Sequence, residues 1–323
     1  MNGQTAVLTE IRSLSAHDGP GLRITLFFKG CSLKCKWCHN PETILSTPEL
    51  EWDEKSCIDC RICEANCPEK AIAFSESKSY IINKNKCTVC GTCVATCPSK
   101  ALKIAGVSFT VNQLFDLIHR DEKFIKRSNG GITFSGGEPA LGYSFIAELA
   151  QKLKAFDYHL ALDTCGMAPA KAYETIVPLM DLILYDLKEI NDEKHRQFTG
   201  ASNELVHENL SLILKLIQQN NLKTEVWIRT PLIPAMTDTY ENIQAIGKFL
   251  SEKADGSVQK WELCTFNNLC IAKYRKLGKE WALEHSDLLT TSYAAQLLKV
   301  AKLSAPIIPG INLSGLTKTN RKT

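Results

Sequence analysis

Apolar and polar positions follow two spacings along most of the chain. Short apolar runs are typical of strands, and between them apolar residues recur three and four positions apart, as on one face of a helix. The expected strands are Ala6–Ile11, Arg23–Lys29, Gly131–Phe134, Tyr158–Leu162, Leu182–Leu187, Thr224–Ile228 and Gln259–Leu263. The expected helices are Val111–Ser128, Ser144–Phe156, Pro169–Met180, Asn203–Asn220, Tyr240–Lys253 and Ser286–Lys302. Strands joined by helices indicate a parallel α/β fold, and the six strands from Arg23–Lys29 onward predict an incomplete (β/α)6 barrel.

Residues 51–103 interrupt this alternation with an internal repeat. The run Cys57-x2-Cys60-x2-Cys63-x3-Cys67-Pro68 returns 30 residues later as Cys87-x2-Cys90-x2-Cys93-x3-Cys97-Pro98. Each half has the spacing of a bacterial ferredoxin, in which the fourth cysteine binds the other [4Fe–4S] cluster. We therefore expect one cube on Cys57, Cys60, Cys63 and Cys97, and a second on Cys67, Cys87, Cys90 and Cys93. Both would be fully coordinated, so they should carry electrons and perform no bond chemistry.

A further cysteine loop, Cys31-x3-Cys35-x2-Cys38, directly follows the strand Arg23–Lys29. Three thiolates can hold three irons of a [4Fe–4S] cube and leave the fourth iron open to a substrate. A structural zinc loop is the alternative from the residues alone, because thiolates also suit zinc and His39 could complete a tetrahedron.

Composition narrows the class of protein. With 323 residues, 44% hydrophobic and 23% charged, the chain can form one large core or one barrel with an inserted module. A net charge of +3 does not indicate nucleic acid or a membrane surface. We see neither a signal peptide nor a long apolar span, and we expect a cytoplasmic protein. Fourteen cysteines there indicate metal rather than disulfides. Solvent-near iron–sulfur clusters also indicate an anaerobic or facultative host.

Around the first cysteine loop the sequence resembles the glycyl-radical enzyme activating enzymes, a subfamily of the radical S-adenosylmethionine (SAM) enzymes. Alone, Asp18-Gly-Pro-Gly21 would be an ordinary turn. Together with Arg23, Gly30-Cys31 and Cys38-His-Asn-Pro41, it matches the start of that family. Further matches are Ser135-Gly-Gly-Glu-Pro139 and Asp186-Leu-Lys188-x6-His195-x3-Thr199-Gly200. The likeness extends from Thr9 to about Gly278.

The resemblance implies a radical SAM barrel with an inserted two-cluster ferredoxin-like domain. The expected parts are 1–50 with the cluster loop, the insertion 51–103, the rest of the barrel 104–285, and a C-terminal helix and tail 286–323, frayed from Thr317. The implied activity is reductive cleavage of SAM and abstraction of a hydrogen from a glycine Cα of a partner glycyl radical enzyme. The implied cofactors are three [4Fe–4S] clusters, SAM and a monovalent cation. Reduced flavodoxin or ferredoxin would donate electrons, and the protein would be a monomer.

The resemblance also assigns roles to single residues. Cys31, Cys35 and Cys38 would hold the SAM cluster, and Asp18 with the Gly19–Gly21 turn would line the entrance for the partner's glycine loop. The SAM contacts would be Trp37 on adenine, Asn40 on ribose, Gly136, Gly137 and Glu138 at the amino group, Lys188 at the carboxylate, Arg229 close by, and Asn267, where many members have histidine. Asp163, Thr164 and Asp186 would hold the cation. His195 is expected to be structural, Cys270 a buried thiol, and Cys165 and Cys264 have no expected role.

Two alternatives remain at this point. One is a different radical SAM enzyme that acts on a small molecule, a peptide or RNA; the D-G-P-G start argues against it. The other is a non-catalytic electron carrier built on the ferredoxin repeat. A pure carrier has no use for a cluster with an open iron.

Overall fold

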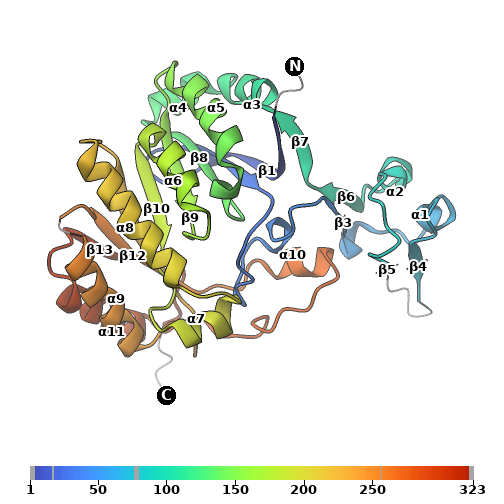
Figure 1. Ribbon diagram of the computed structural model, residues 1–323. Helices are drawn as coiled ribbons and strands as arrows, with labels where there is room; N and C mark the ends of the chain where they lie inside the picture. Colours follow the sequence, from blue (N-terminus) through green and yellow to red (C-terminus); the bar gives the residue numbers. More distant parts are fainter. Residues whose placement is uncertain (1–3, 17, 76–79, 255, 320–323) are drawn as a thin grey trace.

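One nine-stranded sheet forms the centre of the described chain (Figure 1). The computed structural model describes residues 4–16, 18–75, 80–254 and 256–319. The parallel strands are β2 (Arg23–Phe28), β8 (Gly131–Gly136), β9 (His159–Thr164), β10 (Leu182–Asp186), β11 (Glu225–Leu232), β12 (Lys260–Thr265) and β13 (Gly310–Ser314), each beside the next in this order. At the other end, β1 (Thr5–Ser15) pairs antiparallel with β2 and with β7 (Val107–Thr110). Among described strands, β7 and β13 are unpaired edges, so the barrel is open. The predicted open parallel α/β barrel is confirmed, with seven parallel strands among the described residues where six were predicted.

Helices cover the outer face of the sheet. They are α3 (Val111–His119), α4 (Glu122–Arg127), α5 (Tyr143–Lys154), α6 (Ala170–Ile176), α8 (Glu204–Gln219), α9 (Tyr240–Lys253) and α11 (Thr291–Ser304). Two short helices, α7 (Asp192–Thr199) and α10 (Ile271–Lys276), instead contact the backbone of the first cysteine loop. Short 3-10 turns span Pro41–Thr43, Glu54–Ser56, Pro139–Gly142 and Val177–Leu179. Leu114 and Ile118 of α3 and Leu210 of α8 join the main core with the outward residues of the strands. No helix of the described residues is long and apolar enough to cross a membrane.

The inner face is polar on β2 and β8 and at the carboxyl ends of β9–β11, and this positions the site. Further back on β9–β11, Ala161, Leu182 and Leu184 pack with Trp227 in a small apolar cluster. In β2 and β8 the apolar Ile24, Leu26, Ile132 and Phe134 belong to the helix-covered core. Successive strand residues point to opposite faces, so Thr25, Thr133 and Ser135 face inward. The same alternation brings Asp163 of β9, Asp186 of β10 and Arg229 of β11 to the inner face, and Asp186 is paired directly with Arg229 across the ladder.

The insertion projects from the barrel as a small body with its own core (Figure 1). Its stem is β3 (Glu49–Trp52) paired with β6 (Leu102–Ala105), and its other elements are α1 (Ile62–Ala65), β4 (Ile72–Phe74), β5 (Tyr80–Ile82) and α2 (Thr92–Thr96). The repeat is visible in the backbone. Left-handed conformations occur at Asp59, Arg61 and Lys70, and again 30 residues later at Val89, Gly91 and Lys100. The two halves therefore fold alike.

Several boundary predictions need correction. The single helix predicted over Val111–Ser128 is two helices, α3 and α4, with Arg120 and Asp121 between them. Outside the insertion, β7, β13, α7 and α10 were not predicted, and the helix predicted to begin at Ser286 begins at Thr291. The tail expected to fray from Thr317 is tied down at Lys318, whose N–H donates to the Leu289 carbonyl at 2.9 Å and whose carbonyl accepts the Thr291 N–H at 3.0 Å. Residues 320–323 of that tail lie outside the described residues.

Candidate active site

A cavity of about 300 Å³ lies where the carboxyl ends of the parallel strands meet the first cysteine loop. Parallel α/β folds bind their ligands at this edge. Its lining includes all three cysteines of the loop, and nine further residues predicted for the site: Trp37, Asn40, Gly136, Gly137, Asp163, Thr164, Asp186, Lys188 and Arg229. Most of the predicted site is therefore brought together.

The cysteine loop is held from behind by hydrogen bonds to its backbone. The N–H groups of Gly30 and Cys31 donate to the carbonyls of Thr43 (2.7 Å) and Ile44 (3.0 Å). From the segment after β12, the Tyr274 hydroxyl donates to the Cys38 carbonyl at 2.9 Å, and the Trp281 indole donates to the Lys36 carbonyl at 2.8 Å. These bonds leave the thiols free to face the cavity.

Burial keeps two of the three thiols protonated when no metal is bound. It raises the pKa of Cys35 to about 11 and that of Cys38 to about 12. A hydrogen bond with Cys165 lowers the pKa of Cys31. A cluster that binds all three would displace their protons, so its affinity should rise with pH.

The described residues contain no group of three His, Cys, Asp or Glu side chains arranged to hold a metal ion. Thiolates on one zinc lie about 3.8 Å apart, given Zn–S bonds near 2.3 Å, whereas in an iron–sulfur cube each thiolate binds a separate iron. His39, the fourth zinc ligand considered, instead places Nε2 at 3.0 Å from the Asn267 carbonyl. The zinc alternative gains no support.

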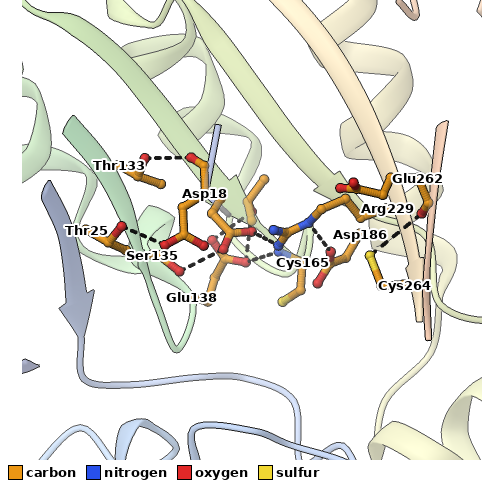
Figure 2. Close-up of polar contacts among 12 residues, drawn as sticks. Asp18, Thr25, Thr133, Ser135, Glu138, Cys165, Asp186, Arg229, Glu262 and Cys264 are labelled. Atoms are coloured by element: carbon orange, nitrogen blue, oxygen red, sulfur yellow. Dashed lines mark hydrogen bonds and ion pairs between the residues drawn. The ribbon is translucent and has the colours of Figure 1, made fainter. Parts of the chain in front are cut away.

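The same cavity is lined by two carboxylates, Asp163 and Asp186, and two cations, Lys188 and Arg229. They come from β9, from β10 and the residues after it, and from β11, and Figure 2 shows Asp186 beside Arg229. Arg229 bridges both acids, with Nη2 bonded to Asp163 and Nε at 3.3 Å from Asp186. Lys188 places Nζ at 2.5 Å from the other oxygen of Asp186. The group is neutral overall, and only a small part of each side chain is exposed. A bound anion can therefore pair with one of the two cations, and a bound cation with one of the two carboxylates, in place of their present partners.

These contacts set opposite pKa shifts on the two acids. Burial raises the pKa of Asp163 to about 6, although Arg229 acts to lower it. Burial also acts to raise the pKa of Asp186, but Lys188 and Arg229 outweigh it and the net shift is downward. Desolvation acts to lower the pKa of Lys188, but the attraction of Asp186 outweighs it and the net shift is upward. Lys188 is therefore a permanent cation at the cavity wall, beside the cysteine loop.

The glycines at the end of β8 permit a close backbone approach. A Cβ on Gly137 would lie 2.2 Å from the Gly30 carbonyl oxygen, and one on Gly136 would lie 2.3 Å from the Phe28 nitrogen. The Gly137 N–H donates to Phe28 at 2.9 Å, and the Glu138 N–H donates to Gly30 at 2.7 Å. This seam joins β8 to the strand that leads into the cysteine loop.

Three predicted site residues do not line the cavity. The buried Glu138 carboxylate accepts from the Thr164 hydroxyl and the Cys165 N–H, both at 2.8 Å, so it supports the wall from behind (Figure 2). The Asp18 carboxylate accepts from the hydroxyls of Ser15 (2.6 Å) and Thr25 (2.7 Å). The inward-facing Thr25 pairs with Thr133, which pairs with Ala161, two residues before Asp163. Asn267 accepts the Leu269 N–H at 3.1 Å. Their assigned roles stay predictions.

Some lining residues were not predicted. They are Leu33, His39, Thr43, Ser135, Cys165, Pro231, Ile233, Cys264, Thr265 and Phe266. The inward alternation of strand residues could have indicated Ser135 and Cys264. Cys270 is buried, as predicted, with Sγ at 3.9 Å from the Cys38 carbonyl. His195 is also buried, with Nδ1 at 2.7 Å from the Ala201 carbonyl, consistent with a structural role.

Two small cavities in the described part of the insertion are lined by cysteines. The cysteines of one are Cys57, Cys60, Cys63 and Cys97. Those of the other are Cys67, Cys87, Cys90 and Cys93. Each set takes three cysteines from one half of the repeat and one from the other.

Known proteins are similar to nearly the whole chain. A family model described as a 4Fe-4S single cluster domain matches residues 17–207. The trans-4-hydroxy-L-proline dehydratase activating enzyme of Clostridioides difficile is 38% identical over 85% of this chain and 89% of its own length. The (2S)-3-sulfopropanediol dehydratase activating enzyme of Klebsiella oxytoca is 32% identical over 92% and 93%. Streptococcus suis SuiB bound to precursor peptide SuiA is 10% identical and superposes with a TM-score of 0.50 over 88% of this chain and 46% of its own.

An open parallel α/β barrel, with a three-cysteine loop after its first parallel strand and a charged cavity at the carboxyl edge, is the arrangement of a radical SAM enzyme. The similarities in sequence refine this class. The chain belongs to the glycyl-radical enzyme activating enzymes, which are oxidoreductases of the radical SAM type. The family expected from the motifs is confirmed, and it is favoured over the electron carrier and over other radical SAM enzymes.

Proposed function

We propose that the cavity binds a [4Fe–4S] cluster and SAM, and that the chain uses them to install a glycyl radical in a partner enzyme. The single observation that carries this proposal is that Cys31, Cys35 and Cys38 share one cavity with Lys188 and Arg229. The thiols suit three irons of a cube, and the cations suit a ligand that carries a carboxylate.

A cluster held by Cys31, Cys35 and Cys38 would supply one electron to break a C–S bond of SAM, and the 5'-deoxyadenosyl radical released with methionine would take one hydrogen atom from a glycine Cα of the partner. No side chain is needed as a general acid or base. The chain's own residues bind and orient SAM.

Lys188 is the strongest candidate for the SAM carboxylate, because it is a buried permanent cation beside the cysteine loop. Asn40 keeps its amide N–H groups for the ribose, since its oxygen already accepts from Lys273 at 2.7 Å. Trp37 lies at the wall, edge-on to Phe198, where it can pack on adenine. Glu138 supports the amino-group site through Thr164 and Cys165. Asn267 stays a nucleoside contact by proposal.

A monovalent cation at Asp163, Thr164 and Asp186 is also part of the proposal. Arg229 already places positive charge between the two acids. A cation there would compete with the guanidinium and free Arg229 to reach SAM. Asp18 remains our choice for contact with the partner's glycine loop, because its carboxylate lies inside the barrel.

The insertion is proposed to carry two further [4Fe–4S] clusters, supported by the two four-cysteine cavities. We propose that a one-electron donor of the flavodoxin or ferredoxin type reduces the chain. We also propose that the protein works as a monomer in an anaerobic, reducing cytoplasm. The relatives are named for dehydratases, a decarboxylase and a sulfite-lyase. The partner proposed here is likewise a glycyl radical enzyme.

The test mixes the anaerobic protein, SAM and dithionite with a partner glycyl radical enzyme, which is first to be identified by a C-terminal Arg-Val-x-Gly-aromatic loop in a neighbouring reading frame. We expect an electron paramagnetic resonance doublet from a glycyl radical, and none with Cys35→Ala. Absence of the doublet with fully loaded wild-type protein, or its presence with the variant, contradicts the proposal.

A further inference from the structure

The two halves of the insertion fold alike but differ in what they expose. Ile58 and Ile62 flank Cys60 in the first half, and Thr88 and Thr92 flank Cys90 at the equivalent positions of the second. Cys60 and Cys90 are both exposed. Ile58 is 63% exposed and Ile62 is 38% exposed. The second half shows that threonine satisfies the fold at these positions, so folding alone does not explain the isoleucines.

The second half faces the barrel. Cys87, Thr88 and Val89 line a cavity of about 570 Å³ together with Leu45, Thr47 and Pro48, which lead out of the barrel. Lys84 also donates to the Leu277 carbonyl at 3.4 Å, next to the helix whose Tyr274 hydroxyl holds the cysteine loop. No cavity shared with the barrel is lined by Cys57, Cys60 or Cys63 among the described residues, and α1 of the first half lies farther from the barrel than the stem strands β3 and β6. The first half is therefore the outer one (Figure 1).

The charges within the loop compensate each other. Arg61 Nε lies 3.6 Å from Asp59 Oδ1, and these are the two charged side chains between the isoleucines. The loop therefore presents two apolar side chains and a compensated ion pair beside an exposed cysteine of a proposed cluster. Exposed apolar groups grouped in this way mark interaction sites, and electron transfer requires close, dry contact.

We propose that the loop from Ile58 to Ile62 is the docking surface for a one-electron flavoprotein, and that electrons enter through the outer cluster and pass by the inner one to the SAM cluster. This inference rests on the proposed function. A flavin that presents its apolar dimethylbenzene edge fits a patch with two isoleucines and a compensated charge pair. One electron leaves the flavin hydroquinone, which becomes the semiquinone, and one cluster of the chain is reduced.

The test compares wild-type protein with Ile58→Thr/Ile62→Thr, which copies the second half onto the first. Ile81→Thr is the matched control, because Ile81 is 52% exposed on β5 of the same insertion. Each anaerobic protein is mixed with flavodoxin hydroquinone, and the rate of cluster reduction is followed by visible absorbance. We expect the double variant to react roughly tenfold more slowly or worse, because two apolar side chains no longer contact the flavoprotein. The Ile81→Thr protein should match wild type.

Dithionite separates this inference from the proposed function. SAM cleavage driven by dithionite should be equal in all three proteins, since a small reductant needs no docking surface. Wild-type protein that fails to cleave SAM with dithionite contradicts the proposed function. The docking surface is overturned if flavodoxin reduces the double variant at the wild-type rate. It is also overturned if the double substitution slows cluster reduction by a reduced ferredoxin but not by flavodoxin. Wild-type reduction by flavodoxin should change little with added salt, and a steep fall would also overturn apolar docking.

Discussion

Replacement of Gly137 by alanine tests how the sheet holds the cysteine loop. The new Cβ would lie 2.2 Å from the Gly30 carbonyl oxygen and 2.9 Å from that of Thr43. Ordinary contact begins at 3.4 Å, so Gly30 must move by 3.4 − 2.2 = 1.2 Å. A shift of this size breaks the 2.7 Å bond from Glu138 to Gly30 and disturbs the one from Gly137 to Phe28. Two hydrogen bonds at about 1 kcal/mol each, with overpacking of about 1 kcal/mol or more, give about 3 kcal/mol of destabilisation.

Cys31 follows Gly30 directly, so the same shift displaces a cluster ligand. We expect Gly137→Ala to lower the iron content from about 12 to about 8 per chain, because the two clusters of the insertion do not depend on this seam. The control is Gly142→Ala, five residues away, where a Cβ meets nothing within 4 Å and the backbone φ is −95°. Its effect should be neutral or stabilising by up to about 1 kcal/mol. Anaerobic urea unfolding and iron analysis measure both. Wild-type iron content and stability in Gly137→Ala would refute the reasoning.

Three further substitutions test the site and its support. Lys188→Gln should weaken SAM binding about 10- to 100-fold in equilibrium dialysis, because a charge-assisted contact of about 1.5–3 kcal/mol is lost; unchanged affinity would remove Lys188 from the carboxylate site. Glu138→Ala should lower the unfolding free energy by about 3 kcal/mol, because the buried Thr164 hydroxyl and Cys165 N–H lose their acceptor, whereas Glu138→Gln should retain most of the stability; equal losses would contradict this role. Burial lowers the pKa of His195 below 6.5, so its neutral form stabilises the fold fully above pH 6.5 and less as the pH falls toward the folded value. The stability advantage of wild type over His195→Gln should therefore shrink below pH 6.5 in urea unfolding, and a constant difference would show that the histidine does not titrate differently on folding.

Periodicity and cysteine spacing predicted most of the architecture. The six strands expected from Arg23–Lys29 onward all occur, because each is an apolar run between helices of clear 3.6-residue period. β13 was missed because Gly310–Ser314 is a short, half-buried edge strand with little apolar signal. The helix break at Arg120 and Asp121 was missed because apolar spacing continues across it, from Ile118 to Ile125.

The motifs located the site but could not give the direction of each side chain. Gly136 and Gly137 line the cavity, yet the next residue, Glu138, turns its carboxylate behind the wall. Asp163 and Asp186 were predicted together as a cation site and Arg229 separately as a residue near SAM, and only the structure shows that all three form one charged group. The inward direction of the polar strand residues was not predicted, because the strands were recognised from their apolar residues.

The central claim is that Cys31, Cys35 and Cys38 hold the cluster that cleaves SAM. The eight cysteines of the insertion hold clusters that only carry electrons. The most direct measurement is 5'-deoxyadenosine formed under dithionite by the Cys31→Ala/Cys35→Ala/Cys38→Ala protein. The account predicts about 8 irons per chain and no 5'-deoxyadenosine, while wild type holds about 12 irons and forms it. Cleavage of SAM by the triple variant would contradict the account.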